Sequence, residues 1–310
     1  MNGPNAPQGN VDEHVFLVGR PPLGEYLAFI ATLAVGGSGI PQGSLAAEWR
    51  KANDHVKELE VGEAGFADNP TIGKIPQAQQ PLVTQIFDDP IFKRSFQFVP
   101  TDIGLVELDR FVVYQKYINL KYVKDLQAKL GKKPSDDDVF RFCLPVDHPA
   151  PPVRLMQTAA NSYSFISSSN DFRFVEAKLF APNDLTNYSR QGPVTSVLGL
   201  VIGYGANFLS GIKLENRLIL LNGSHRAFAL RDMGITHVPC LVQHVSRREE
   251  LEVLVQGEVS QKPDIYLKAP RPPLLKDYFD PALRKKVPVA RKDRLVRVTF
   301  GVEQSDIPAS

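Results

Sequence analysis

The chain has 310 residues, of which 43% are hydrophobic and 23% charged, and its formal net charge is +2. This composition excludes a wholly disordered chain, because enough apolar surface is present to offset the entropy lost on folding. No apolar run is long enough for a signal peptide or a membrane span, so we expect a cytoplasmic protein without a membrane partner. The two cysteines, Cys143 and Cys240, lie in apolar runs and form no Cys-x-x-Cys pair, which gives no support to a zinc site or a disulfide.

Residues 1–95 are expected to form a helical N-terminal extension. A strand is expected over 15–18 and an apolar helix over 24–35. A second helix is expected from residue 44 to about residue 60. Its apolar residues recur at spacings of four and three, which is typical of one helical face: Leu45, Trp49, Ala52, Val56 and Leu59. We expect this face to pack onto the rest of the chain or onto a second copy, so a homodimer is one alternative.

Residues 96–245 are expected to form an α/β (α+β) core. A strand over 106–113 precedes a helix that Asn119 caps and Gly131 ends. Later in the chain, two strands joined at residues 215 and 216 predict a hairpin over 207–221.

A helix from about Ser224 to Met233 follows the hairpin, and Gly234 stops it. A final apolar strand is expected over 238–245. The apolar run 194–202, which lies before the hairpin, is compatible with a helix.

Residues 132–192 interrupt the core and are expected to form a β-rich insertion. Two stretches, 163–166 and 172–175, have the alternation of strands. The insertion opens with Ser135-Asp-Asp-Asp138, which we interpret as a solvated loop, with a site for a hard cation as the alternative.

The turn Asn222-Gly-Ser-His-Arg226 lies between an apolar strand and a helix. Gly223 permits an unusual backbone conformation. The first turn of a helix has free N–H groups, which together with the helix dipole form an anion site. Arg226 adds a planar, permanently charged group suited to phosphate, and Ser224 adds a hydroxyl. The turn therefore predicts a phosphate-binding site.

The stretch Leu218–Val242 resembles the ParB/sulfiredoxin-like superfamily. That family shows a strand, a Gly-x-x-Arg turn that opens a helix, a glycine, and a strand that starts at Val-Pro, and all of these stand here in order. Residues 106–130, with Gln115 after the strand, are similar to the family's opening strand and helix. The resemblance implies a small mixed sheet with flanking helices. It also implies a nucleotide-binding site that is formed by Gln115, Asn222, Gly223, Ser224, His225 and Arg226.

Two departures from the family narrow the expected function. Sulfiredoxins carry a reactive cysteine where this chain has Ser224, and a serine cannot supply the thiolate of that repair chemistry. ParB partition proteins carry Gly-Glu-Arg-Arg at this turn and bind CTP, whereas this chain has Gly223-Ser-His-Arg226. Residues 246–310 form a basic, proline-rich extension without a visible helix-turn-helix, which argues against chromosome partitioning.

We therefore expect a nucleotide- or phosphate-binding protein, with hydrolysis or phosphotransfer as the candidate reaction. The expected ligand is a nucleoside triphosphate such as CTP or ATP, with Mg²⁺. His225 and Glu215 are the candidate catalytic residues, although Glu215 is also the expected hairpin-turn residue. The sequence does not choose among the carboxylates that could hold the metal, namely Glu107, Asp109, Glu176 and Glu215.

The alternative function is a non-enzymatic DNA-associated adaptor or switch protein. Residues 268–297 hold ten basic and three acidic residues, so this segment is able to bind DNA, an acidic partner or the chain's own acidic body. The alternation of apolar and polar residues over 295–300, which begins near the end of this segment, predicts a strand. A ParB-like nuclease is a second alternative, although no metal-binding carboxylate pair stands at a convincing spacing.

Overall fold

The computed structural model describes residues 11–184, 192–255 and 257–308, and the mixed α/β class expected from the sequence is confirmed. The described residues fall into two compact units. Unit 1 contains the chain up to Asp147 together with Asn207–Arg291, and unit 2 contains His148–Ala206 together with Lys292–Ser310. The insertion therefore begins later than residue 132, and it shares its unit with the end of the chain.

Unit 1 is built around a five-stranded mixed sheet with the order β10-β9-β11-β3-β2. Its strands are β2 (Ile72–Gly73), β3 (Thr101–Glu107), β9 (Ser210–Leu214), β10 (Arg217–Asn222) and β11 (His237–Val245). Strands β9 and β11 are parallel, and the other neighbouring pairs are antiparallel. Strand β10 is therefore an edge strand, and its last residue, Asn222, leads directly into the turn that the sequence singled out.

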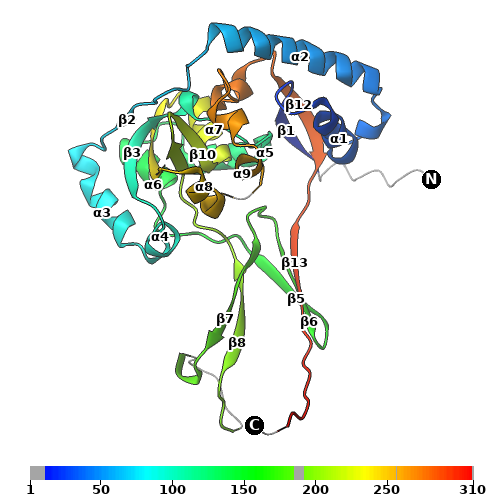
Figure 1. Cartoon of the computed structure of the whole chain (residues 1–310), viewed down its shortest axis with the longest axis vertical. Coiled ribbons are helices and arrows are strands. Elements are labelled where there is room, and N and C mark those ends of the chain that lie inside the picture. The colour runs from blue at the N-terminus through cyan, green and yellow to red at the C-terminus, as the bar shows by residue number, and fades with distance from the viewer. Residues whose placement is uncertain (1–10, 185–191, 256, 309–310) are drawn as a thin grey trace. The chain divides into compact units, whose positions relative to one another are not determined.

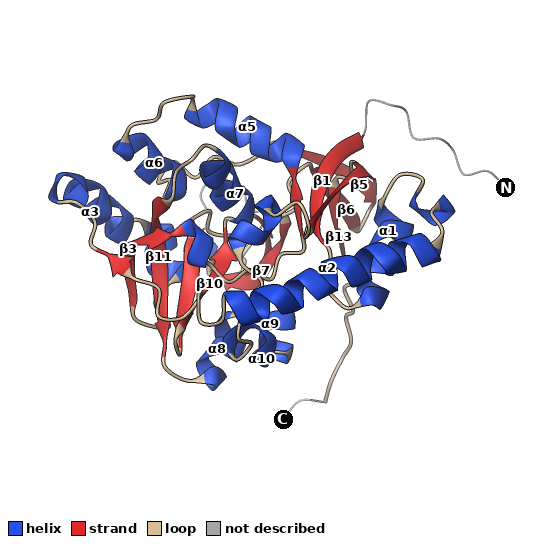
Figure 2. Ribbon diagram, turned by 90° about the horizontal axis from the view of Figure 1, so that it is seen from above, coloured by secondary structure: helices blue, strands red, loops and turns tan. Residues whose placement is uncertain are grey.

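Helices cover both faces of this sheet. Figure 2 shows α5, α6 and α7 on one side and α8, α9 and α10 on the other. The first group is α5 (Leu120–Leu130), α6 (Asp136–Cys143) and α7 (Ser224–Asp232). The second group is α8 (Arg248–Leu254), α9 (Glu258–Gln261) and α10 (Asp264–Leu267). The second group encloses a core with Ile212, Ile219 and Leu251.

A second sheet of unit 1 joins the two ends of its chain. Its order is β12-β1-β4, formed by β1 (Val11–Leu17), β4 (Tyr117–Asn119) and β12 (Arg284–Ala290), and all pairs are antiparallel. Helices α1 (Leu23–Leu33) and α2 (Gln42–Gly62) pack against this sheet (Figure 1). The expected apolar face of α2 does pack on the body, since Leu45, Ala52 and Val56 are buried there.

The remaining helices of unit 1 are short. They are α3 (Gln80–Asp88), α4 (Pro90–Ser95) and the 3₁₀ turns at Gly37–Gly39, Gln77–Gln79, Leu108–Arg110 and Leu275–Phe279. The turn at Leu108–Arg110 corrects the strand expected over 106–113. The strand ends at Glu107 because the backbone then turns, and Leu108 donates to the carbonyl of Thr236.

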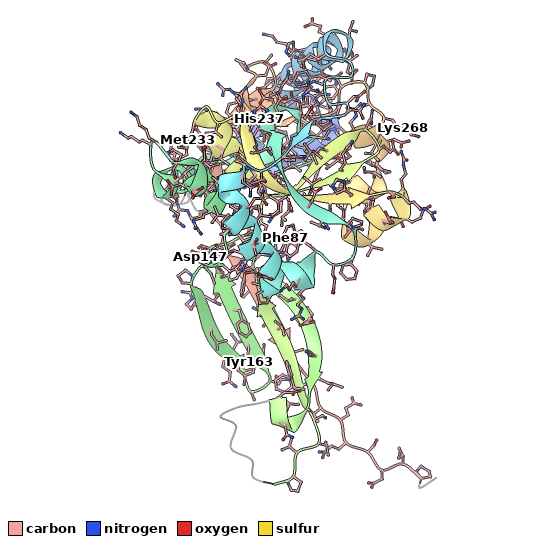
Figure 3. The ribbon with its side chains drawn as sticks, turned by 90° about the vertical axis from the view of Figure 1, so that its left-hand side faces the viewer. Phe87, Asp147, Tyr163, Met233, His237 and Lys268 are labelled. Carbon is pink, nitrogen blue, oxygen red and sulfur yellow. The ribbon has the colours of Figure 1, made fainter. Side chains whose placement is uncertain are left out.

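Unit 2 consists of strands. A three-stranded antiparallel sheet contains β5 (Val153–Ala159), β6 (Ser162–Ser167) and β13 (Arg294–Thr299), and Tyr163 of β6 is labelled in Figure 3. A separate ribbon contains only β7 (Arg173–Phe180) and β8 (Val197–Gly203). A 3₁₀ turn at Pro182–Asp184 follows β7.

The helix-compatible run 194–202 is instead strand β8. Seven apolar or glycine residues in a row fit either structure, and local pattern does not separate the two. The antiparallel register with β7, from Phe180 opposite Val197 to Arg173 opposite Gly203, decides the outcome. Pairing across the ribbon thus overrode the local expectation.

No helix among the described residues is both long enough and apolar enough to cross a membrane.

Candidate functional site

The turn at 222–226 has the backbone of an anion site. Gly223 has φ 94° and ψ 25°, and α7 begins at the next residue. A Cβ at this glycine would lie 2.6 Å from Cδ1 of the buried Leu209, so the left-handed conformation and the close approach both require glycine. No side chain in the described part of the chain caps α7. The N–H groups of Ser224, His225 and Arg226 have no hydrogen-bond acceptor among the described residues.

Helices α5 and α7 run side by side in the same direction. At their first turns, the N–H of Asn119 donates to Nε2 of His225 at 3.0 Å. Further along both helices, Nε2 of Gln127 on α5 donates to the carbonyl of Ala229 and to the carboxylate of Asp232 on α7. The N-termini of the two helices consequently lie together. Because each carries about half a positive charge, their dipoles reinforce each other at this place.

The side chain of His225 joins helices α5 and α7, because one of its two ring nitrogens bonds to α5. Its Nε2 is the acceptor for Asn119, and the Tyr122 ring meets it edge-on with 5.4 Å between centroids. Burial, followed by the charge of nearby His14, lowers the pKa of His225 from 6.5 to about 4. The ring is therefore neutral at pH 7. A neutral imidazole whose Nε2 is already occupied positions the turn, and this geometry gives no support to its predicted catalytic role.

Arg226 points into the protein. Its side chain donates to the carbonyls of Cys143 at 2.8 Å and Asn207 at 3.3 Å, and to Oδ1 of Asn207 at 2.7 Å. Cys143 is the last residue of α6, so the guanidinium sits at the negative end of that helix. The guanidinium of Arg226, which was predicted to bind phosphate, thus already donates to carbonyl oxygens. Its acceptors are uncharged, so the buried positive charge is not cancelled by a carboxylate.

The other predicted ligands lie at the same end of β10. Asn222 is exposed, and its side-chain amide donates to the carbonyl of Phe208 at 2.9 Å. Ser224 is half-buried, and its hydroxyl has no hydrogen-bond partner among the described residues. Gln115 donates to the carbonyl of Tyr117 at 3.3 Å. The neighbouring Tyr114 hydroxyl bonds to the carbonyl of Leu221 at 2.9 Å, which holds the segment that carries Gln115 against the end of β10.

Glu215 does not belong to this group. It lies in the β9–β10 hairpin with φ 51°, at the opposite end of β10 from Asn222. Its carboxylate accepts two hydrogen bonds from Arg248, at 3.0 and 3.1 Å. The strand that separates Glu215 from His225 has six residues, which is roughly 20 Å at about 3.3 Å per residue. The structure therefore does not bring these two candidate catalytic residues together, and the hairpin interpretation of Glu215 is confirmed.

The predicted metal candidates are also engaged elsewhere. Glu107 pairs with Arg110, and Asp109 pairs with Arg231. The Asp136–Asp138 run forms the first turn of α6, where Asp138 completes a capping box with Ser135. This corrects the loop expected there, because three acidic residues after a serine stabilise a helix N-terminus.

The turn itself does not fit a magnesium ion held by the protein. In the described part of the chain, residues 223–226 form no hydrogen bond or ion pair with a carboxylate. No group of three or more His, Cys, Asp or Glu among the described residues is arranged to hold a metal. A magnesium ion here would have to be held mainly by the phosphates of its ligand, and we derive no step through it.

The basic segment 268–297 mostly contacts the chain's own acidic residues. Six of its ten basic side chains form ion pairs, and five of those pairs are with the first 63 residues. The five are Arg271 and Lys276 with Glu63, Lys285 with Glu48, Lys286 with Glu13, and Arg291 with Asp12. Contact with its own body, which was one of the three sequence alternatives, is thus observed. DNA binding through this segment stays a prediction.

Sequence reasoning missed the two residues that hold the turn in place, Asn119 and Asn207. Asn119 was expected as a helix cap, and its side chain does accept from the N–H of Tyr122 at 3.0 Å. Its backbone contact to His225 has no sequence signal. The bonds between Arg226 and Asn207 have none either, because the two residues are 19 positions apart and only the fold brings them together.

Comparison of the chain with models of known families, with curated proteins and with solved structures found no match.

Proposed function

We propose that this protein binds a phosphate-bearing nucleotide where the N-termini of α5 and α7 meet. The observation that carries the proposal is the parallel arrangement of these helices, joined by the bond from Asn119 to His225 at 3.0 Å. The positive ends of two helix dipoles meet here, and the Asp12 carboxylate, which accepts from Asn119 at 3.1 Å, is itself paired with Arg291 at 2.7 Å. An anion is the ligand that such a point favours.

The phosphate would be held by the main chain. The N–H groups of Ser224, His225 and Arg226 are the donors, and the Ser224 hydroxyl adds a further one. Arg226 would act from beneath through its charge, since its nitrogens already bond to Cys143 and Asn207. Asn222 and Gln115, which lie at the same end of β10, are the groups available to a ribose or a base.

The resemblance of 218–242 to ParB/sulfiredoxin-like proteins supports a nucleoside triphosphate such as CTP or ATP as the ligand, brought in with Mg²⁺. The proposal is one of binding, with hydrolysis or phosphotransfer as a further step that turnover measurements decide. The two catalytic candidates give that step little support, because His225 is occupied and Glu215 lies at the far end of β10.

The test is titration calorimetry with the four ribonucleoside triphosphates plus Mg²⁺, and with inorganic triphosphate alone. Ser224→Asp should abolish binding, since a carboxylate at the first position of α7 would occupy the free N–H groups and repel phosphate. The same carboxylate favours the helix, so the fold should remain intact. Ser44→Asp, at the start of α2, is the matched control and should bind like the wild type.

Several outcomes would count against the proposal. If no nucleotide and no triphosphate binds, nucleotide binding is wrong. If binding persists in Ser224→Asp, the ligand lies elsewhere. Triphosphate binding without any preference among nucleotides would reduce the proposal to a phosphate site. A salt-dependent affinity for DNA in the absence of nucleotide binding would favour the adaptor alternative instead.

A further inference from the structure

Unit 2 has almost no apolar core of its own. Of the buried apolar residues in the described chain, only Phe172 belongs to this unit. The unit instead exposes large apolar side chains on its strands and at the end of the chain. They are Val153, Leu155, Met156, Phe174, Val175, Leu179, Leu198, Leu200, Leu295, Phe300, Val302 and Ile307. A set of strands that buries so little needs a further surface to offset the entropy of its ordering.

The β7–β8 ribbon shows this most clearly. Figures 1 and 3 show two strands that extend together, and the described residues add no third strand to them. A two-stranded ribbon by itself is marginally stable in water. Leu179 and Leu198 lie directly opposite each other and are 69% and 64% exposed. On the same face, Leu200 stands opposite Ala177.

The two faces of the ribbon differ. On the other face, the Phe180 ring lies over Gly199, where an added Cβ would come within 2.4 Å of the ring, and the amino group of Lys178 lies 5.4 Å from the ring centroid. That face is therefore closed by its own side chains. The face of Leu179, Leu198 and Leu200 is apolar and open.

We propose that the β7–β8 ribbon is a self-association surface on which a second copy of this chain pairs its own β8 antiparallel, centred on Leu200. Strand β8 carries no charge and no proline, and edge strands without either are open to pairing. Its sequence, Val-Leu-Gly-Leu-Val-Ile-Gly, presents apolar or glycine residues in both directions from Leu200. Pairing about this residue sets Leu198 opposite Ile202 of the other copy.

Charge favours β8 over the other edge strands of unit 2, which are β5, β7 and β13. Each of these carries at least one charged residue, for example Arg154 on β5 and Arg294 and Arg297 on β13, so two copies of β13 would bring like charges close together. The charged residues of the ribbon are Arg173, Glu176 and Lys178, and all three lie on β7, away from the proposed axis. A symmetric contact through β8 therefore brings no charged side chains face to face.

Pairing along β8 would join the two-stranded ribbons of two copies into one four-stranded antiparallel sheet. A two-stranded ribbon is marginally stable in water, whereas a sheet of three or more strands with an apolar face is stable enough to stand by itself. This inference does not depend on nucleotide binding.

The first test is the oligomeric state of the full chain by sedimentation velocity up to about 100 µM, a concentration that detects dissociation constants in the micromolar range. The wild type should be a dimer. Leu198→Asp should weaken the dimer about tenfold or more by placing a charge in the apolar contact. Lys178→Glu, on the closed face, is the matched control and should leave the dimer unchanged.

The second test fixes the register. Opposite Cα atoms in antiparallel strands are about 4.5–5.5 Å apart, which a disulfide can span. Leu200→Cys should therefore form a covalent dimer under a mild thiol oxidant, whereas Leu198→Cys should not, because it faces Ile202 of the other copy. The native Cys143 and Cys240 are buried and do not compete.

A monomeric wild type at the highest concentration overturns the proposal. So does a dimer that Leu198→Asp leaves intact and that Leu200→Cys fails to cross-link. If Leu198→Asp impairs folding, which a thermal melt would show, the cysteine pair decides the question by itself.

Discussion

The backbone N–H of Asn119 donates to Nε2 of His225 at 3.0 Å, and this bond joins residues that are 106 positions apart in the chain. It holds the first turn of α5 against the first turn of α7. Both helix N-termini consequently lie at the same place, beside the Asn222–Arg226 turn. The proposed anion site depends on this bond, because separated helix ends would not add their potentials.

The first prediction concerns pH and His225. Folding lowers the pKa of this ring from 6.5 to about 4, so its neutral form stabilises the fold fully above pH 6.5. That contribution is lost as the pH falls from 6.5 towards 4. Between pH 7 and 4, the free energy of unfolding of the wild type should drop by up to about 3 kcal/mol more than that of His225→Gln. Urea unfolding at several pH values measures the difference.

His14 serves as the control for this prediction. Burial also lowers its pKa, so His14→Gln should reduce the same acid sensitivity. Because the charge of His14 contributes to the lowered pKa of His225, the effects of the two substitutions should not be additive. Identical pH profiles for His225→Gln and the wild type would show that His225 does not carry the effect.

The second prediction concerns Gly223. Replacing it with alanine forces a side chain into φ 94° and towards Leu209, with 2.6 Å between Cβ and Cδ1. Gly234 has a similar φ of 84°, but an added Cβ would meet nothing within 4 Å. We expect Gly223→Ala to cost about 2–3 kcal/mol and Gly234→Ala about 1 kcal/mol. Equal losses in chemical denaturation would mean that the contact with Leu209 relaxes freely.

The third prediction separates two arginines of α7. Arg226 is 7% exposed and satisfies Asn207 and the carbonyl of Cys143. Arg226→Ala would leave those acceptors buried without a donor, which should cost about 2–4 kcal/mol. Arg231→Ala breaks a half-exposed pair with Asp109 and a cation–π contact with Phe279 at 4.1 Å, and it should cost about 1–1.5 kcal/mol. Thermal melts of the two variants test the difference, and a reversed order would contradict the structural role of Arg226.

The fourth prediction concerns the buried carboxylate of Asp277. It is 1% exposed, bonds to Arg271 and to the N–H of Leu274, and lies 3.5 Å from Arg20. Asp277→Asn would leave two buried guanidinium groups without their shared anion, at a cost of about 3–5 kcal/mol. The resulting loss should be visible as a lower midpoint of urea unfolding.

Glu58→Gln is the matched control for Asp277→Asn. Glu58 pairs with His55, but its side chain is 78% exposed, so solvent replaces the lost contact and the variant should unfold like the wild type. A comparable loss in both variants would mean that net charge, rather than the buried network, sets the stability.

Local elements followed from the sequence where local chemistry determines them. Asn119 caps α5 through its own side chain, and Gly131 and Gly234, both with positive φ, end the helices before them. The hairpin at Glu215, the turn at Gly223 and the strand of β11 were likewise predicted. The caps, the hairpin and the turn each depend on a backbone angle or a hydrogen bond that spans only a few residues, whereas β11 was recognised by its apolar run.

The roles of the site residues were decided by tertiary structure. His225 and Arg226 were expected to face a ligand, but their partners, Asn119, Cys143 and Asn207, come from distant segments. The run that forms strand β8 was interpreted as compatible with a helix, because seven apolar or glycine residues fit both structures until β7 pairs with them. The sequence by itself determined the Asn119 cap, the glycine ends of α5 and α7, and the turns at Glu215 and Gly223. Which side chains remain free to bind was decided only by folding, because a buried donor takes whichever acceptor the fold brings within reach.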